Sequence, residues 1–158
     1  MISALRDRAA LALRRRGARP PDVVIGDAAF PYLRRWHLIP RNRVFNVYLH
    51  HFCRSDDDRA LHDHPWWNMS WLLDGTYLEH KTDGVYARRQ GDVVFRGGRA
   101  PHRIQLLQSL YGREKPVWTL FITGPRFRAW GFHCKAGWRP WQEFTTPDGK
   151  GVGPGCGP

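Results

Sequence analysis

The stretch from Leu61 to Gly75 reads LHDHPWWNMSWLLDG and carries two histidines, His62 and His64, separated by one residue. If the stretch begins as a β-strand, its side chains alternate between two faces, so both histidines share one face and Asp63 lies on the other. Two neutral imidazoles on one face can converge on a divalent transition metal such as Fe, Mn, Ni or Zn. A His-x-His pair alone is weak, because one histidine can equally be a hydrogen-bonded core residue and the other an exposed one.

A third histidine follows at a spacing that gives the pair more weight. Residues 91–95 (GDVVF) form a short strand-like run, residues 96–101 (RGGRAP) read as a turn, and His102 comes directly after it. Many other short apolar runs are bounded by turn signals, and together they predict a β-sandwich or barrel. Between two of these runs, Asp74-Gly75 predicts a tight hairpin turn. The other runs cover residues 22–25, 44–52, 68–73, 76–81, 85–89, 104–106, 117–122 and 129–134.

Length and composition fit one folded domain. The chain has 158 residues, of which 42% are hydrophobic and 13% aromatic, and this composition excludes a disordered chain. Several of the 8 tryptophans lie in strand-like runs, which favours an aromatic-lined β architecture. We expect a basic N-terminal helix and linker at 1–20, a barrel at 21–146 and a flexible Gly/Pro-rich tail at 147–158.

The formal net charge is +11, most of it from arginine, which is compatible with a nucleic acid, an acidic partner or an anionic substrate. The basic residues are scattered and no nucleic-acid-binding motif accompanies them, so we expect mainly a solvated basic surface. No apolar stretch is long enough to span a bilayer, and the short apolar run at 9–13 precedes three arginines rather than a cleavage site. We therefore expect neither a signal peptide nor a membrane partner.

The cysteine pattern bears on the redox setting. The three cysteines, Cys53, Cys134 and Cys156, include no Cys-x-x-Cys pair. An odd number without that pair predicts neither a disulfide framework nor a structural zinc site. The simplest setting is then a reducing cytoplasm.

The motifs resemble those of the cupin superfamily. The first cupin motif is a Gly, a spacer, His-x-His, three or four residues, Glu, six residues and Gly; His62, His64 and Gly75 match it. The second begins with Gly and ends with His; Gly91 and His102 match it, with two glycines where Pro-x-Gly usually lies. The resemblance covers roughly residues 44–132. It implies an all-β, cupin-type jelly-roll (double-stranded β-helix) barrel with a short N-terminal helix, and a metal at His62, His64 and His102.

The sequence departs from the family pattern at the usual Glu ligand, whose place falls at Asn68 or Met69. The second motif also lacks its Pro. Cupins such as the thiol dioxygenases resemble this pattern, since they bind iron through three histidines and no carboxylate. The resemblance therefore implies Fe(II), with Mn, Ni or Zn as alternatives. A fourth ligand could be Glu79, Asn68, His51 or water.

Other candidate site residues depend on which side chains face the interior. If Tyr77 and Glu79 do, Glu79 could be a general base or could support a metal ligand, with Tyr77 as a catalytic partner. Otherwise, Glu79 is a surface carboxylate paired with Lys81 or an arginine. Arg96, Arg99 and Arg103 flank His102, and any of them could clamp a carboxylate or phosphate, although we expect at least two of the three to be solvent-exposed loop charges. The candidate substrate-binding residues are Trp66, Trp71, Phe95, Arg96 and Trp118.

Several function classes compete at this point. The first is a metal-dependent cupin enzyme, in particular a mononuclear non-haem iron dioxygenase acting on a small organic anion. The second is a non-catalytic cupin that binds a small ligand or acts as a sensor, which the missing Glu favours. The third is a nucleic-acid-associated protein, which the basic charge favours. A weaker fourth is a sugar-nucleotide isomerase or epimerase with a His base and Tyr77 as acid. Because cupins often pair through strand edges, we expect a homodimer.

Overall fold

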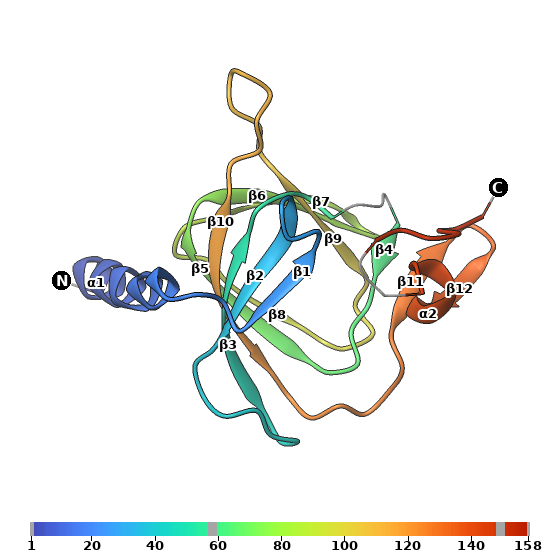
Figure 1. The fold of residues 1–158 in the computed structure, drawn as a ribbon, viewed down its shortest axis with the longest axis horizontal. Helices are drawn as coiled ribbons and strands as arrows, with labels where there is room; N and C mark the ends of the chain where they lie inside the picture. Colours follow the sequence, from blue (N-terminus) through green and yellow to red (C-terminus); the bar gives the residue numbers. More distant parts are fainter. Residues whose placement is uncertain (1, 57–59, 148–150, 158) are drawn as a thin grey trace.

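Two antiparallel sheets form the body of the protein in the computed structural model, which describes residues 2–56, 60–147 and 151–157 (Figure 1). Each sheet has six strands in the described residues, which confirms the predicted all-β fold. In spatial order, the first sheet contains β1 (Val23–Gly26), β2 (Pro31–His37), β3 (Asn46–Phe52), β10 (Val117–Thr123), β5 (Asn68–Asp74) and β8 (Val93–Arg96). The second contains β12 (Gly137–Pro140), β11 (Gly131–Cys134), β4 (Leu61–His62), β9 (His102–Leu106), β6 (Thr76–Lys81) and β7 (Gly84–Arg89).

Alternation along the strands creates an inner and an outer face. In β10 every second residue is buried, from Val117 through Thr119 and Phe121 to Thr123, while the residues between them are only partly buried. Because successive side chains point to opposite faces, one face of this strand lies against the interior. The buried inner cluster draws residues from both sheets, namely Leu33, Phe52, Leu72, Tyr77, Ile104, Leu106 and Val117.

The N-terminal helix α1 (Ile2–Arg15) packs on the outer face of the first sheet and extends away from it (Figure 1). Ala10 is buried there and Leu13 is partly buried, whereas Leu5 is 70% exposed. The helix therefore contacts the sheet through its second half. A short 3-10 turn, η1 (Arg16–Ala18), follows it. The sheet side of this outer cluster consists of Trp36, Leu49, Leu73, Trp71, Trp118, Leu38 and Leu120. No helix in the described part of the chain has the length and apolar character needed to cross a membrane.

Gly75 changes the chain from one sheet to the other, so the hairpin expected at Asp74-Gly75 is wrong. The preceding strand β5 pairs with β8 and β10, and the following strand β6 pairs with β7 and β9. The backbone of Gly75 has φ +92°, and a Cβ there would lie 2.9 Å from Val117 Cγ2. An Asp-Gly pair supplies the positive φ that a hairpin needs, but a corner between sheets needs it equally. A hairpin does join β6 to β7.

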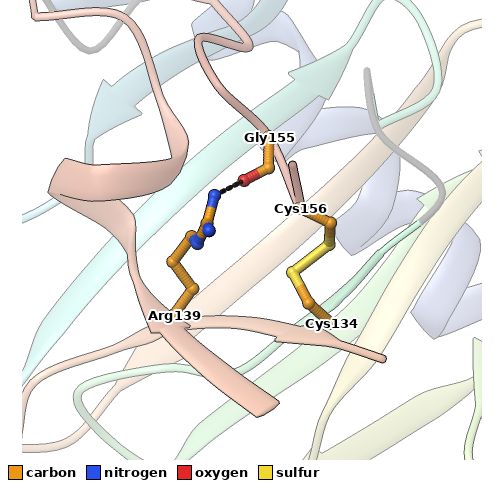
Figure 2. The surroundings of a disulfide bond; sticks show 4 residues. All are labelled: Cys134, Arg139, Gly155 and Cys156. Carbon is orange, nitrogen blue, oxygen red and sulfur yellow. Dashed lines mark hydrogen bonds between the residues drawn. A yellow bond between two sulfur atoms is a disulfide. The ribbon is translucent and has the colours of Figure 1, made fainter. Parts of the chain in front are cut away.

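The end of the chain folds back onto the second sheet, where Cys134 of β11 and Cys156 form a disulfide across 22 residues (Figure 2). Arg139 Nη1 donates a hydrogen bond to the Gly155 carbonyl at 2.6 Å. The N–H groups of Gly153 and Gly155 both donate to the Phe144 carbonyl in helix α2 (Trp141–Phe144). No disulfide framework was expected, yet one disulfide forms, because an odd cysteine count does not prevent one pair when the chain returns to the same place. These contacts join residues 151–157 of the predicted tail to β11, β12 and α2.

Candidate metal centre

Two neighbouring strands and the segment after one of them bring three histidines together. His62 ends β4, His102 begins β9, and the two are paired directly across the antiparallel ladder. His64 follows two residues later, where its backbone N–H donates to the Gly98 carbonyl at 3.0 Å in the turn before β9. One ring nitrogen from each histidine lies within 4.8 Å of the others, and His64 Nε2 is 2.8 Å from His102 Nε2. Because three nitrogen donors converge in this way, the cluster fits a divalent transition metal.

Burial favours the uncharged state that metal ligation requires. Burial lowers the pKa of His64 well below its ordinary value, and the neighbouring His102 and His62 lower it further. Burial also lowers the pKa of His102, to about 4, although its contact with Glu79 acts in the opposite direction. Both imidazoles are therefore neutral at neutral pH, and neutral imidazole is the form that binds metals.

Carboxylates stand behind two of the three histidines. Glu79 Oε1 lies 3.2 Å from His102 Nδ1, and Asp56 Oδ2 lies 3.7 Å from His62 Nδ1. A carboxylate this close to His102 Nδ1 favours the ring hydrogen on Nδ1, which leaves the Nε2 lone pair free for a metal, whereas the longer Asp56 contact is beyond hydrogen-bond distance. Asp56 is itself held in place, because it accepts hydrogen bonds from the Tyr32 hydroxyl and from the backbone N–H of Ile104.

Glu79, whose side chain is fully buried, belongs to an ionic network. Its carboxylate accepts from Arg96 Nε at 2.5 Å and from Arg88 Nε at 2.7 Å. Burial alone would raise the pKa of Glu79, but the hydrogen bonds from His102, Arg96 and Arg88 outweigh it and bring the pKa below its ordinary value. Arg96 also donates to Asn68, Ser70 and the Tyr77 hydroxyl. We call Glu79, Arg88, Arg96 and Tyr77 the Glu79 network.

This network places three predicted site residues behind the histidines. Glu79 and Tyr77 do not line the cavity described below, so the geometry favours the second reading of Glu79, support of a metal ligand, over that of a general base. Arg96 does not line it either, because its side chain is buried among the network's own acceptors. Of the proposed fourth ligands, Glu79 faces His102 Nδ1, and His51 stacks on Trp118 on the outer face at 4.1 Å between ring centroids. In the described residues only the three histidines form the cluster.

A cavity of about 440 Å³ adjoins all three histidines. Its wall comes from both sheets and from the segment around α2. Aromatic and aliphatic side chains supply most of it, in a mixture typical of small-molecule sites. The lining residues are Ile25, Tyr32, Leu33, Arg35, His50, Phe52, His62, His64, Pro65, Trp66, Ser70, His102, Ile104, Phe121, Trp130, Trp141 and Thr145.

Of the four aromatic residues predicted to bind substrate, only Trp66 lines the cavity. Trp71 and Trp118 lie on the outer face of the first sheet, in the cluster beneath α1. Phe95 is 66% exposed and stacks on Trp67. These three residues were predicted because they are large and aromatic. The alternation of side chains within β5, β8 and β10 turns all three outward.

The structure adds cavity residues that sequence reasoning missed, among them Arg35, His50, Trp130 and Trp141. Arg35 of β2 and His50 of β3 are directly paired across their strands. Alternation could have suggested the arginine, because it stands two residues from the buried Leu33. The choice between His50 and His51 needed the register of β3, which only the neighbouring strands define.

No protein-family model matches the sequence, and no curated protein matches it. Solved structures do. A mannose-6-phosphate isomerase-like protein from Ralstonia eutropha JMP134 matches at 15% identity and a TM-score of 0.51, covering 66% of this chain and 92% of that one. A cupin superfamily protein from Desulfitobacterium hafniense DCB-2 matches at 14% identity and a TM-score of 0.47, covering 59% and 77%. These proteins share the double-stranded β-helix arrangement of two sheets. The chain has the cupin fold.

A third cupin-fold match is the DMSP lyase DddQ from Ruegeria pomeroyi DSS-3, at 17% identity and a TM-score of 0.48. The match covers 66% of this chain but only 53% of the lyase, so this chain spans about half of that protein. At such identities the likeness concerns the fold alone. The chemistry must therefore be argued from the residues of this chain itself.

Proposed function

We propose that this cupin is a metal-dependent enzyme that holds one divalent ion at His62, His64 and His102 and acts on a small organic anion. The observation that carries the proposal is the convergence of three ring nitrogens within 4.8 Å on the wall of a cavity. Three protein ligands leave positions open for substrate and a second reactant. We further propose Fe(II) as the ion and oxygenation as the reaction class, because open positions on Fe(II) let substrate and dioxygen bind together.

The charge of the cavity supports an anionic substrate. Among the lining residues that the structure describes there is no aspartate or glutamate, while Arg35 adds a positive charge. A metal ion would add more positive charge. A small anion would neutralise both, whereas a cation would have no partner in this wall.

The protein's own residues would hold the ion and exclude water. Glu79 would orient His102 through its Nδ1 atom, and Asp56 lies 3.7 Å from the Nδ1 atom of His62. Trp66, Trp130 and Phe121 supply apolar surface around the substrate. When bound, the ion would supply a place to bring substrate and dioxygen together.

The first experiment is elemental analysis of the purified protein, with and without reconstitution, beside a His62→Ala, His102→Ala double variant. We expect near-stoichiometric metal in the wild type and its loss in the double variant. His80→Ala is the matched control, because His80 bonds Gln105 in the second sheet and is not a member of the cluster. Absence of metal in the wild type after reconstitution would contradict the proposal.

The second experiment tests the reaction class. Dioxygen uptake by the Fe(II)-reconstituted protein is measured with pools of small organic acids. We expect uptake with at least one pool and none in the double variant. Stoichiometric Zn that iron cannot replace would overturn oxygenation and favour metal-assisted hydrolysis or isomerisation. Bound iron without uptake would favour a ligand-binding or sensor cupin.

A further inference from the structure

We propose that Arg35 and His50 form a carboxylate-binding subsite in the cavity, separate from the three histidines. That this subsite holds the carboxylate of a substrate during a reaction rests on the proposed function. The binding site itself stands on contacts that do not involve the metal cluster.

Arg35 is a cavity arginine without a counter-ion in the described chain. Its Nε donates to His50 Nε2 at 2.8 Å, and its guanidinium lies 4.8 Å from the centroid of the Tyr48 ring. No described carboxylate forms an ion pair with it, whereas Arg14, Arg19, Arg88, Arg96 and Arg128 each have one. Burial lowers the pKa of Arg35. Because a guanidinium has a planar fork of donors, those not used by His50 suit the two oxygens of a carboxylate.

His50 supplies a second donor through its tautomer. An arginine N–H can only donate, so His50 Nε2 accepts from Arg35 and the ring hydrogen of neutral His50 must lie on Nδ1. The residue is 2% exposed and lines the cavity. Its Nδ1 is buried and has no hydrogen-bond partner in the described part of the chain. A buried N–H without an acceptor is rare in folded proteins and points to a missing ligand atom.

A third donor lies in the same wall. Trp66 Nε1 is also buried without a partner among the described residues, and an indole nitrogen can only donate. Arg35, His50 and Trp66 thus offer donors to one cavity whose described wall holds no carboxylate. An oxyanion supplies the acceptors that these groups lack.

The residues around the subsite favour a ligand whose carboxylate is attached to an apolar group. The ring of Phe121 lies 4.8 Å from that of His50 and 6.4 Å from that of His64, so one aromatic residue adjoins both the subsite and the metal cluster. Leu33, Phe52 and Ile104 add aliphatic and aromatic wall. A short hydrocarbon chain or ring could therefore extend from the carboxylate at Arg35 towards the histidines.

The test is calorimetric titration of the full-length protein, freed of metal with a chelator, with 3-phenylpropionate, 3-phenylpropionamide and inorganic phosphate. We expect the carboxylate to bind at least about tenfold more tightly than the amide, since charge-assisted hydrogen bonds form only with the acid. Phosphate, which has no apolar body, should bind more weakly than the carboxylate. Equal binding of acid and amide, phosphate binding as tight as that of the acid, or no binding of the acid would overturn the subsite.

Variants assign the binding to named residues. Arg35→Gln and His50→Phe should each weaken carboxylate binding at least about tenfold. Arg34→Gln, which changes the exposed arginine next to Arg35, should leave binding unchanged. Should Arg35→Gln not fold, His50→Phe decides the question. Full affinity in a folded Arg35→Gln or His50→Phe protein would overturn the assignment.

The metal-site double variant separates this proposal from the proposed function. If His62→Ala, His102→Ala binds 3-phenylpropionate as the wild type does, the subsite is independent of the metal, even if elemental analysis finds none. If instead the acid binds only to metal-loaded protein and Arg35→Gln does not alter that binding, the subsite is overturned while the metal-dependent function stands.

Discussion

Two arginines on the inner faces of the sheets, Arg96 and Arg35, differ in how their charge is compensated. Arg96 is 5% exposed and donates to Glu79, Asn68, Ser70 and Tyr77. Arg35 lines the cavity, bonds a neutral histidine and has no described carboxylate partner. The charge of Arg96 is neutralised by Glu79 inside the protein. The charge of Arg35 remains available to a ligand that enters the cavity.

The difference separates stability from binding. A buried charge whose partner is removed becomes uncompensated, which typically costs about 3–5 kcal/mol. An arginine without a counter-ion has no such partner to lose, so its removal should affect ligand binding more than folding. Each prediction below would break or sharpen this distinction.

The largest expected effect is on the Glu79 network. Glu79→Gln would leave Arg96 and Arg88 without their carboxylate, and we expect a loss of about 3–5 kcal/mol in the free energy of unfolding, measured with urea. Metal affinity should fall about 10- to 100-fold, because His102 loses the group that fixes its tautomer. Arg35→Gln is the matched comparison and should cost clearly less. A cost for Arg35→Gln equal to that for Glu79→Gln would abolish the distinction.

The next effect concerns the disulfide between Cys134 and Cys156, which closes a loop with a sequence separation of 22. Cys156→Ser should lower the free energy of unfolding under oxidising conditions by about 3 kcal/mol, because an open loop has more freedom in the unfolded chain. Trp141 of α2 and Thr145 directly after it line the cavity, and residues 151–157 bond to this segment through Phe144 and Thr145. The binding of 3-phenylpropionate should therefore weaken while metal content stays unchanged. Cys53→Ser is the control, since Cys53 is a free thiol. Loss of metal in Cys156→Ser would show that the metal cluster also depends on this wall.

The disulfide also changes what the cysteine count can support. Disulfides persist in oxidising compartments and are rare in a reducing cytoplasm. The number of cysteines favoured a cytoplasmic location only as long as none was paired. The cytoplasmic location therefore stays a prediction without that argument.

The metal cluster was the part of the site most accessible from the sequence. His62 and His64 are separated by one residue, so local alternation was enough to place them together, and the motif spacing added His102. The cavity wall was less accessible because it depends on which face of each strand turns inward. Trp71, Phe95 and Trp118 are large and apolar but face outward, and size alone carries no information about register.

Charged residues showed the same limit. Arg96 was proposed as a substrate clamp because it is close to His102 in sequence. In the fold, Arg96 on β8 of the first sheet instead pairs with Glu79 on β6 of the second sheet. Arg35 was not considered because it lies 67 positions before His102 in the sequence, with several strands between them. Only the fold brings both residues to one cavity. Contacts between distant strands are what local patterns cannot supply.

The smallest effect is a difference in acid sensitivity between the two regions. Burial, followed by the charge of Arg35, lowers the pKa of His50 well below its ordinary value. The unfolded chain then binds more protons than the folded protein once the pH falls below about 6.5, so stability is lost as the pH falls from there. The pKa of Glu79 is also lowered, but from an unfolded value of about 4.3, so its contribution is lost only in more acidic solution.

His50→Phe should therefore reduce the slope of unfolding free energy against pH by at most about 1.4 kcal/mol per pH unit between about pH 6 and pH 5. Urea unfolding of chelator-treated protein at several pH values measures this slope without a contribution from bound metal. Arg34→Gln should keep the wild-type slope, which controls for a general change in charge. Glu79→Gln should also keep it in this range, because Glu79 stays ionised there in both folded and unfolded chains. An unchanged slope in His50→Phe would mean that His50 takes up its proton in the folded state as readily as in the unfolded one. The charge of Arg35 would then not prevent His50 beside it from becoming protonated. Arg35 and His50 could no longer be described as an uncompensated cation with a neutral partner.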